Sequence, residues 1–131
     1  MTDGVKLGEI DIFPGFYLLS LEDAILNYRT FVGDMRWQVG WLPLFADGDG
    51  DFYIIDLGME SGRPVRGFWI EWGEHSVEFS SLNMMLRTVA MGFARGVLFL
   101  DSNGYLSMDF HEFEVLASEV DPGVKDWDDY Q

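Results

Sequence analysis

The segment WLPLFADGDGDFYIIDL, residues 41–57, decides how the fold and function of this chain are interpreted. An apolar run that includes Pro43 leads into the acidic, glycine-rich turn Asp47–Asp51, and a second apolar run ends at Asp56. Three hypotheses fit this arrangement. The turn is a calcium-binding loop, a cluster of catalytic carboxylates, or a tight turn that marks a family of binding proteins.

The spacing of the turn argues against calcium. An EF-hand loop needs glycine at its sixth position and a bidentate glutamate at its twelfth. Counted from Asp47, these positions hold Phe52 and Gly58. The segment DSNGYLSMDFHE, residues 101–112, also resembles such a loop, but Leu106 occupies its sixth position. A type I′ turn at its Asn-Gly pair explains this segment better. We therefore expect neither a metal site nor a cofactor.

The residues needed for catalysis form no recognisable motif. The histidines, His75 and His111, lie outside metal-ligand patterns such as HExxH, and Ser61 lacks the GxSxG frame of a nucleophile elbow. Paired carboxylates serve as acid and base in hydrolases, but 23 Asp and Glu residues supply close pairs in any fold. The sequence therefore predicts a protein without enzymatic activity, and a hydrolase that uses an acid pair is the alternative.

Composition predicts one folded domain over residues 1–131. Hydrophobic residues make up 48% of the chain and aromatic residues 16%, which is too apolar for intrinsic disorder. No apolar run approaches the roughly 18 residues that span a bilayer, and the first residues lack the features of a signal peptide. The chain contains no cysteine for a disulfide framework. We expect a cytoplasmic protein that does not bind membranes.

The charge is strongly negative and unevenly distributed. Eight Lys and Arg against 23 Asp and Glu give a formal net charge of −15, and nine of the acids lie in residues 97–131 with Lys125 as the single base. Proteins bind nucleic acids through Lys and Arg, so this balance argues against DNA or RNA as a partner. It favours a basic protein partner, steered by charge and weakened by salt. Solubility alone is the competing explanation.

Apolar residues at helical spacing between cap signals predict helices at residues 20–33, 80–96 and 109–121. Their core-facing side chains are expected to be Leu21, Ala24, Ile25, Tyr28, Phe31, Val32, Leu82, Met85, Leu86, Val89, Phe93, Phe113, Leu116, Ala117 and Val120.

Strands are predicted at residues 37–41, 52–57 and 65–72, followed by a hairpin of residues 97–100 and 105–108. Strands with helices before, between and after them predict an α+β fold with a mainly antiparallel sheet packed with about three helices.

Two residues of the opening segment have expected structural roles. Pro43 donates no ladder hydrogen bond and is expected at a strand start or edge. Asp56 is expected either to face solvent or to accept backbone hydrogen bonds nearby.

The succession of short motifs resembles the SUKH superfamily, which includes bacterial immunity proteins and fungal regulators of cell-wall synthesis. Residues 41–57 are similar to its Trp-Leu-Pro entry, acidic glycine turn and Asp-Leu exit. Residues 62–65 (GRPV) resemble its Gly-x-Val strand, and residues 96–106 resemble its late hairpin. Residues 121–127 (DPGVKDW) look like its closing element, with Asp121 in place of Asn.

The resemblance covers about residues 13–127, because residues 16–23 also resemble the strand and helix that precede the central tryptophan. Family members usually begin with extra helices. Residues 1–12 are therefore expected to be disordered or to form a shortened N-terminus.

The resemblance implies a SUKH-like domain without catalytic activity. Bacterial members act as immunity proteins that bind a cognate toxin, often a nuclease, and block it. The acidity fits this role, because a nuclease needs a basic cleft for its substrate. A regulatory scaffold of the fungal kind is the alternative. The residues expected to face the partner are Asp47, Asp49, Asp51, Asp101, Asp109, Glu112, Glu114 and Glu119.

Overall fold

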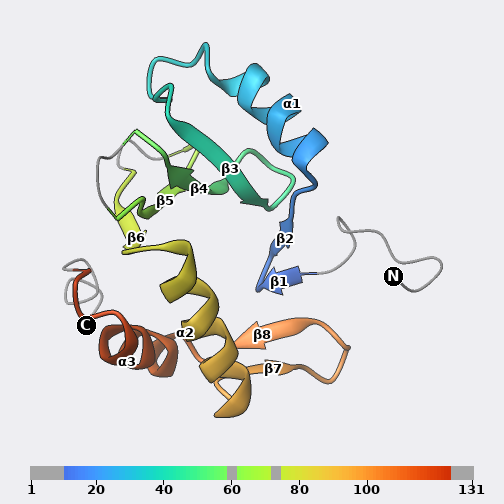
Figure 1. Ribbon diagram of the computed structural model, residues 1–131. Coiled ribbons are helices and arrows are strands. Elements are labelled where there is room, and N and C mark those ends of the chain that lie inside the picture. The colour runs from blue at the N-terminus through green and yellow to red at the C-terminus, as the bar shows by residue number, and fades with distance from the viewer. Residues whose placement is uncertain (1–10, 59–61, 72–74, 125–131) are drawn as a thin grey trace.

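The computed structural model describes residues 11–58, 62–71 and 75–124 (Figure 1). Within these residues it confirms the predicted α+β fold, with a mainly antiparallel sheet and three helices. In chain order the elements are β1 (Asp11–Phe13), β2 (Phe16–Leu18), α1 (Leu21–Phe31), β3 (Trp41–Ala46), β4 (Phe52–Asp56), β5 (Val65–Phe68), β6 (Val77–Phe79), α2 (Leu82–Ala94), β7 (Leu98–Leu100), β8 (Leu106–Met108) and α3 (Phe110–Val120).

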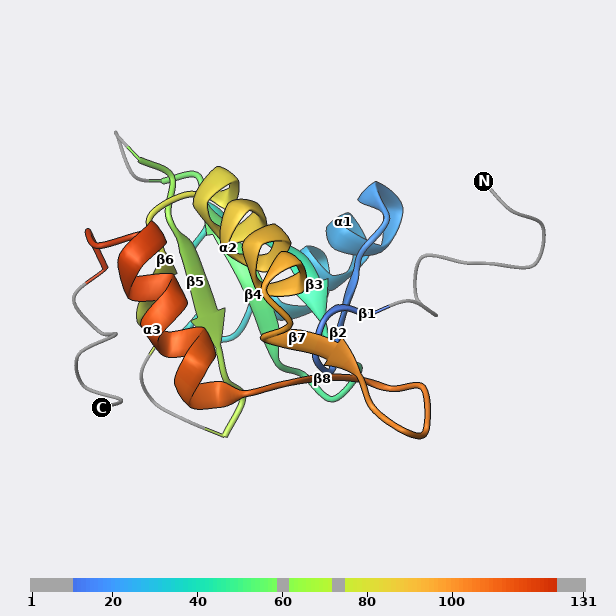
Figure 2. The ribbon, with the colours of Figure 1, turned by 90° about the horizontal axis from the view of Figure 1, so that it is seen from below.

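The larger sheet is a six-stranded meander in which each strand from β1 to β6 pairs antiparallel with the next. α1 covers one face of this sheet, and α2 and α3 cover the other (Figures 1 and 2). The hairpin of β7 and β8 forms a separate small sheet that follows α2. Because the central strand β4 is covered on both faces, its sequence is an almost continuous apolar run, FYIID.

One hydrophobic core lies between α1 and the sheet. Its buried members are Leu19, Ala24, Trp37, Trp41, Ala46, Phe52, Ile54 and Phe68. α1 begins as its cap signal predicted, because the hydroxyl of Ser20 accepts a hydrogen bond from the Asp23 N–H at 3.1 Å. The prediction that Leu21 and Ile25 face this core is wrong, since they are 71% and 38% exposed. α1 meets the sheet along a stripe narrower than its apolar face, and part of that face is left to solvent.

The second core lies on the opposite face. Its buried members are Phe13, Phe45, Tyr53, Val65, Phe79, Met85, Val89, Val97, Leu98, Phe113, Ala117 and Val124. The predicted inward orientation of Leu86 and Phe93 is wrong, because these side chains are 45% and 47% exposed. α2 instead turns Thr88 and Gly92 inward, and a Cβ atom at Gly92 would lie 3.0 Å from Leu98 Cδ1. The small residue allows α2 to approach β7 closely.

The strand predicted at residues 37–41 is wrong. The chain makes successive turns there, with hydrogen bonds from Trp37 N–H to Asp34 O at 3.0 Å and from Trp41 N–H to Gln38 O at 3.0 Å. The strand β3 starts only at Trp41. The two tryptophans share one core, with ring centroids 6.1 Å apart, because the turns place them on the same side. Two tryptophans four residues apart also fit the alternation of a strand, which is why the sequence pattern predicted one here.

The β7–β8 hairpin is confirmed, but its predicted type I′ turn is wrong. A type I′ turn needs a positive φ at both central residues. Of the pair Asn103 and Gly104, only Gly104 has a positive φ, at +82°. Asp101 Oδ1 accepts hydrogen bonds from the N–H groups of Asn103 at 2.9 Å and Tyr105 at 3.0 Å. This side-chain cap closes the loop of residues 101–105, in which Gly104 is left-handed.

Pro43, which has no backbone N–H group, lies at a position where no neighbouring strand needs that donor. It sits in the first half of β3, which pairs with β4 alone, since β2 joins β3 only at Phe45 and Ala46.

β1 and β6 were not predicted, and both have only three residues. β5 ends at Phe68, earlier than predicted. Residues 11 and 12 belong to β1, whereas residues 1–10 and the closing residues 125–131 lie outside the described part of the chain.

Candidate partner-binding site

The acidic turn between β3 and β4 is organised by its first aspartate. Asp47 Oδ1 accepts hydrogen bonds from the N–H groups of Asp49 at 2.8 Å and Asp51 at 3.1 Å. Gly48 and Gly50 have φ of +88° and +101°, a conformation that glycine adopts without steric cost. The carboxylate of Asp49 is exposed and makes no hydrogen bond within the described residues, so it is the member of the turn most open to a partner.

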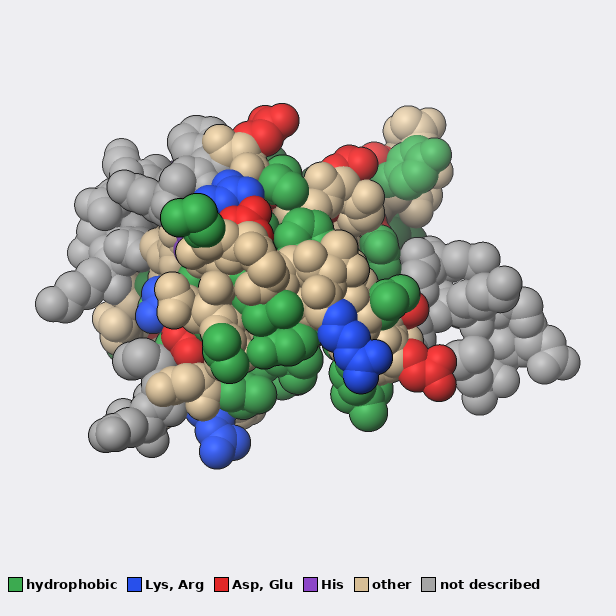
Figure 3. Space-filling view, turned by 90° about the horizontal axis from the view of Figure 1, so that it is seen from above, with side chains coloured by type: hydrophobic (Ala, Val, Ile, Leu, Met, Phe, Trp, Pro, Cys, Tyr) green, Lys and Arg blue, Asp and Glu red, His purple; other side chains and the backbone are tan. Residues whose placement is uncertain are grey.

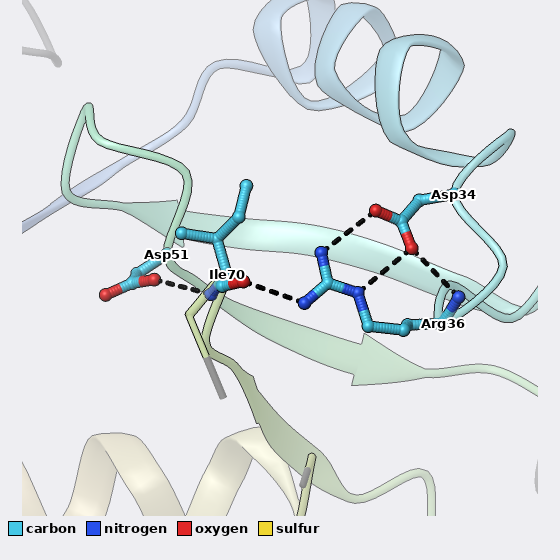
Figure 4. Close-up of polar contacts among 4 residues, drawn as sticks. All are labelled: Asp34, Arg36, Asp51 and Ile70. Atoms are coloured by element: carbon cyan, nitrogen blue, oxygen red, sulfur yellow. Dashed lines mark hydrogen bonds and ion pairs between the residues drawn. The ribbon is translucent and has the colours of Figure 1, made fainter. Parts of the chain in front are cut away.

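Asp51 joins this turn to the end of β5 (Figure 4). Its Oδ1 accepts a hydrogen bond from the Ile70 N–H at 2.8 Å, and the Ile70 carbonyl accepts one from Arg36 Nη1 at 2.7 Å. The Arg36 guanidinium also donates to both oxygens of Asp34, at 3.1 and 3.0 Å. These hydrogen bonds from Arg36 lower the pKa of Asp34 from 3.8 to about 2. Asp51 therefore has a structural role that the sequence did not reveal.

Asp56 accepts hydrogen bonds, as one of its two predicted roles required. It is buried, its Oδ1 accepts from the Gly58 N–H at 3.0 Å, and its Oδ2 pairs with Arg66 Nε at 2.9 Å. The Arg66 guanidinium lies 5.9 Å from the centroid of the Trp41 ring. The Asp-Leu exit of the opening motif thus joins β4 to β5 through the ion pair of Asp56 with Arg66.

The five late carboxylates have different environments. Asp101 closes the hairpin loop, and Asp109 caps α3 by accepting from the Glu112 N–H at 3.0 Å. Glu119 pairs with Arg95 at 3.4 Å, and both side chains are more than half exposed. The carboxylates of Glu112 and Glu114 make no hydrogen bond or ion pair within the described residues; Glu112 is exposed and Glu114 half-buried.

A cavity of about 550 Å³ brings two of the eight predicted residues together. Asp51, at the start of β4, and Glu114, on α3, both line it. Glu78 on β6 adds a third carboxylate, which is 8% exposed and accepts a hydrogen bond from the Ser76 hydroxyl at 3.4 Å. The remaining described lining residues are Phe13, Pro14, Phe16, Tyr53, Trp69, Ser76, Phe79, Met108, Phe110 and Phe113.

The walls of this cavity are built largely from aromatic rings. Tyr53 and Trp69 meet edge to face with centroids 5.4 Å apart, and Phe16 lies 4.8 Å from Tyr53. Gly67 makes this arrangement possible, because a Cβ atom there would lie 2.2 Å from Trp69 Cζ2. The Trp69 ring therefore lies across β5, on the same face of the sheet as α3.

Arginines contact aromatic rings on the α1 side of the sheet, whereas acidic residues line the cavity on the other side. Arg36 and Arg66 lie on the α1 side, where their guanidinium groups stand 5.2 Å from the Phe68 ring and 5.9 Å from the Trp41 ring. On the other side, the described lining of the cavity contains three carboxylates and no Lys, Arg or His. The lining of this cavity is therefore acidic, although Arg87 and Arg95 of α2 line a separate hollow together with Glu119 of α3.

His75 is a half-buried residue on the α1 side, and its two ring nitrogens are buried. Its ring stacks on Phe68, with centroids 4.5 Å apart and planes 9° apart, and neither ring nitrogen has a hydrogen-bond partner within the described residues. Burial lowers the pKa of His75, and the nearby Arg36 charge lowers it further. The imidazole therefore packs as a flat ring against the aromatic residues Phe68 and Trp41. Among the described residues no three His, Asp or Glu side chains are arranged to hold a metal ion.

A second, shallower hollow lies on the α1 side. Figure 3 views the molecule from that side and shows hydrophobic side chains gathered on the surface. The hollow has a volume of about 210 Å³ and includes Ile25, Val39 and Leu57, which are 38%, 79% and 47% exposed. No acidic or basic side chain lines it within the described residues.

Sequence reasoning missed Glu78 and the aromatic residues around it. The segment VEF, residues 77–79, places one acid between two apolar residues, and this pattern is the local signal for a carboxylate in a short buried strand. The contribution of Trp69 had no comparable signal, because its position over the cavity depends on Gly67 and on the end of β5 at Phe68.

Comparisons with known proteins provide no assignment: no protein-family model matches the chain, and no curated protein matches it. The SUKH resemblance therefore remains a prediction. No helix in the described part of the chain is long and apolar enough to cross a membrane.

Proposed function

We propose that this protein is a non-catalytic, cytoplasmic binding module of the SUKH immunity type, which binds a basic toxin domain and blocks it. One observation carries the proposal. Asp51 and Glu114, two acids that the sequence predicted to face a partner, line the same aromatic cavity together with Glu78. An apolar concavity with a few convergent charged groups is the usual form of a binding site.

The roles of the acids support binding over catalysis. A general acid or base must exchange protons with substrate, whereas Asp47, Asp51, Asp101 and Asp109 each accept a hydrogen bond from a backbone N–H group. Such a carboxylate is held in a fixed position by the backbone. The groups thus serve as charged parts of a rigid surface, which is what electrostatic recognition of a basic partner needs.

Toxin rescue tests this proposal directly. The protein is co-expressed with candidate basic toxin domains, nucleases first, and we expect growth to be restored together with formation of a stable complex. Association should slow as salt is raised, because steering by surface charge is screened. Failure to neutralise any such toxin, together with native pull-downs that return signalling proteins, would establish the regulatory scaffold instead.

A pair of matched variants locates the surface. Glu112 and Glu22 are both exposed acids in the first turn of a helix, so reversing either charge has a similar effect on its helix dipole. We expect Glu112→Lys, like Asp49→Lys, to slow association severalfold at low salt, with a much smaller effect for Glu22→Lys. Equal effects of Glu112→Lys and Glu22→Lys would contradict the assignment of these acids to the partner-facing side.

A further inference from the structure

The large cavity combines aromatic walls with acidic residues. Its walls include Tyr53, Trp69 and Phe113, and Asp51 and Glu114 line it as well. A charged group beside apolar walls loses hydration, and a partner of opposite charge offsets this loss. Neither Asp51 nor Glu114 forms an ion pair within the described residues.

Two of the carboxylates have unused hydrogen-bonding capacity. Asp51 gives Oδ1 to the Ile70 N–H, while its Oδ2 accepts no hydrogen bond within the described residues. Glu114 is half-buried and makes no ion pair there. Both groups are therefore free to receive donors from a ligand while the turn and α3 keep their internal contacts.

The chemistry of the walls selects one kind of cation. A metal ion such as calcium needs six to eight oxygen ligands, and no three carboxylates are arranged for metal binding within the described residues. A lysine ammonium is compact and strongly hydrated, whereas a guanidinium is planar, stacks on aromatic rings and donates two parallel hydrogen bonds to a carboxylate. The protein already makes such contacts on its other face, where Arg36 and Arg66 lie over aromatic rings.

We infer that the cavity between α3 and the sheet binds an arginine side chain, with its guanidinium between the aromatic walls and the carboxylates of Asp51 and Glu114. The cavity volume of about 550 Å³ is sufficient for this side chain together with part of the segment that carries it. The inference rests on the proposed function in that it takes the arginine from a basic protein partner. It adds the residue type that the partner must insert.

The test uses small probes and the full chain. N-acetyl-arginine methylamide is titrated into ¹⁵N-labelled protein, with the lysine compound and the neutral citrulline compound as controls. We expect saturable shifts at the Trp69 indole and at the backbone of Asp51 and Glu114, weaker binding of the lysine probe, and no saturation with citrulline. Shifts spread over all exposed acids, or equal responses to arginine and citrulline, would overturn the inference.

Two isosteric variants provide the matched control. Glu114→Gln and Glu22→Gln each remove a single negative charge from a helix, but only Glu114 lines the cavity. We expect Glu114→Gln to weaken the arginine probe about fivefold or more, because a charge-assisted hydrogen bond is lost. Glu22→Gln should change the affinity less than about twofold, as expected for a screened surface charge. Equal losses would refute the site.

The outcome separates this inference from the proposed function. If a basic toxin is neutralised but its binding is no more sensitive to Glu114→Gln than to Glu22→Gln, the function stands and the cavity is not the arginine site. If the probe binds with the expected dependence on Glu114 while no toxin is neutralised, the arginine site stands and the immunity role fails.

Discussion

Replacing Asp56 with asparagine tests whether the buried ion pair at the end of β4 holds the fold. Asparagine has nearly the same shape and can still accept the hydrogen bond from the Gly58 N–H, which is 3.0 Å from Asp56 Oδ1. The substitution replaces Oδ2, which accepts from Arg66 Nε at 2.9 Å, with an amide NH2 group, so it removes both the negative charge and this hydrogen bond. Arg66 then remains as a half-buried cation beside Trp41.

The expected loss of stability follows from the burial of the ion pair. Removing one partner of a buried ion pair costs about 3–5 kcal/mol, because the other charge stays desolvated and unpaired. The Asp56 side chain is 9% exposed and the Arg66 side chain is 22% exposed, so water reaches part of the guanidinium. We therefore expect Asp56→Asn to lower the free energy of unfolding by about 3 kcal/mol, the lower end of that range.

Urea unfolding followed by tryptophan fluorescence measures the change. With a denaturant slope of about 1.5 kcal/mol per molar, the midpoint should fall by about 2 M. Glu119→Gln is the control, because it breaks an exposed ion pair with Arg95 that should contribute less than about 1 kcal/mol. A loss below about 1 kcal/mol for Asp56→Asn, or equal losses for the two variants, would refute the reasoning that burial gives the pair its importance.

Three further predictions concern the fold. Gly40→Ala should destabilise the protein by more than about 2 kcal/mol in urea unfolding, because its Cβ would lie 2.6 Å from a backbone nitrogen, whereas Gly33→Ala, with open space around it, should be nearly neutral. Asp121→Ala should cost about 2 kcal/mol, since this buried carboxylate accepts a 2.7 Å hydrogen bond from the chain just before α2, and Asp121→Asn should cost less. The free energy of unfolding should fall as pH is lowered from about 7.5 to 5.5, because His75 binds a proton at its ordinary pKa in the unfolded chain but has a lowered pKa in the folded protein. His75→Gln should remove most of this dependence of the unfolding free energy on pH, and His111→Gln should not.

The helices show how far local signals reach. Caps depend on a side chain and an N–H group three residues later, so Ser20, Ser81 and Asp109 could be recognised in the sequence, and each accepts the expected hydrogen bond. The α+β class also followed from local periodicity. The core-facing residues of the helices were predicted less well, because the width of a helix's buried stripe depends on the elements that pack against it. The exposed side chains of Leu21 and Phe93 show this.

Short strands and turns depended on distant partners. β1 and β6 have three residues each and are defined by their pairing with β2 and β5, which no local pattern encodes. The turns at residues 37–41 were mistaken for a strand because two tryptophans four residues apart fit either conformation. In the structure, hydrogen bonds to the carbonyls of Asp34 and Gln38 close the turns, and both rings lie in the α1-side core.

The sequence by itself determined the helix boundaries, the tight turn at residues 47–51 and the strong negative charge, because each depends on neighbouring residues or on composition alone. Only the tertiary structure decided what the acids do. It placed Asp51 and Glu114 on one cavity although they lie 63 positions apart in the chain, and it added Glu78 from a strand too short to predict. The physical reason is that pairing and packing across the sheet, rather than spacing along the chain, determine which side chains converge.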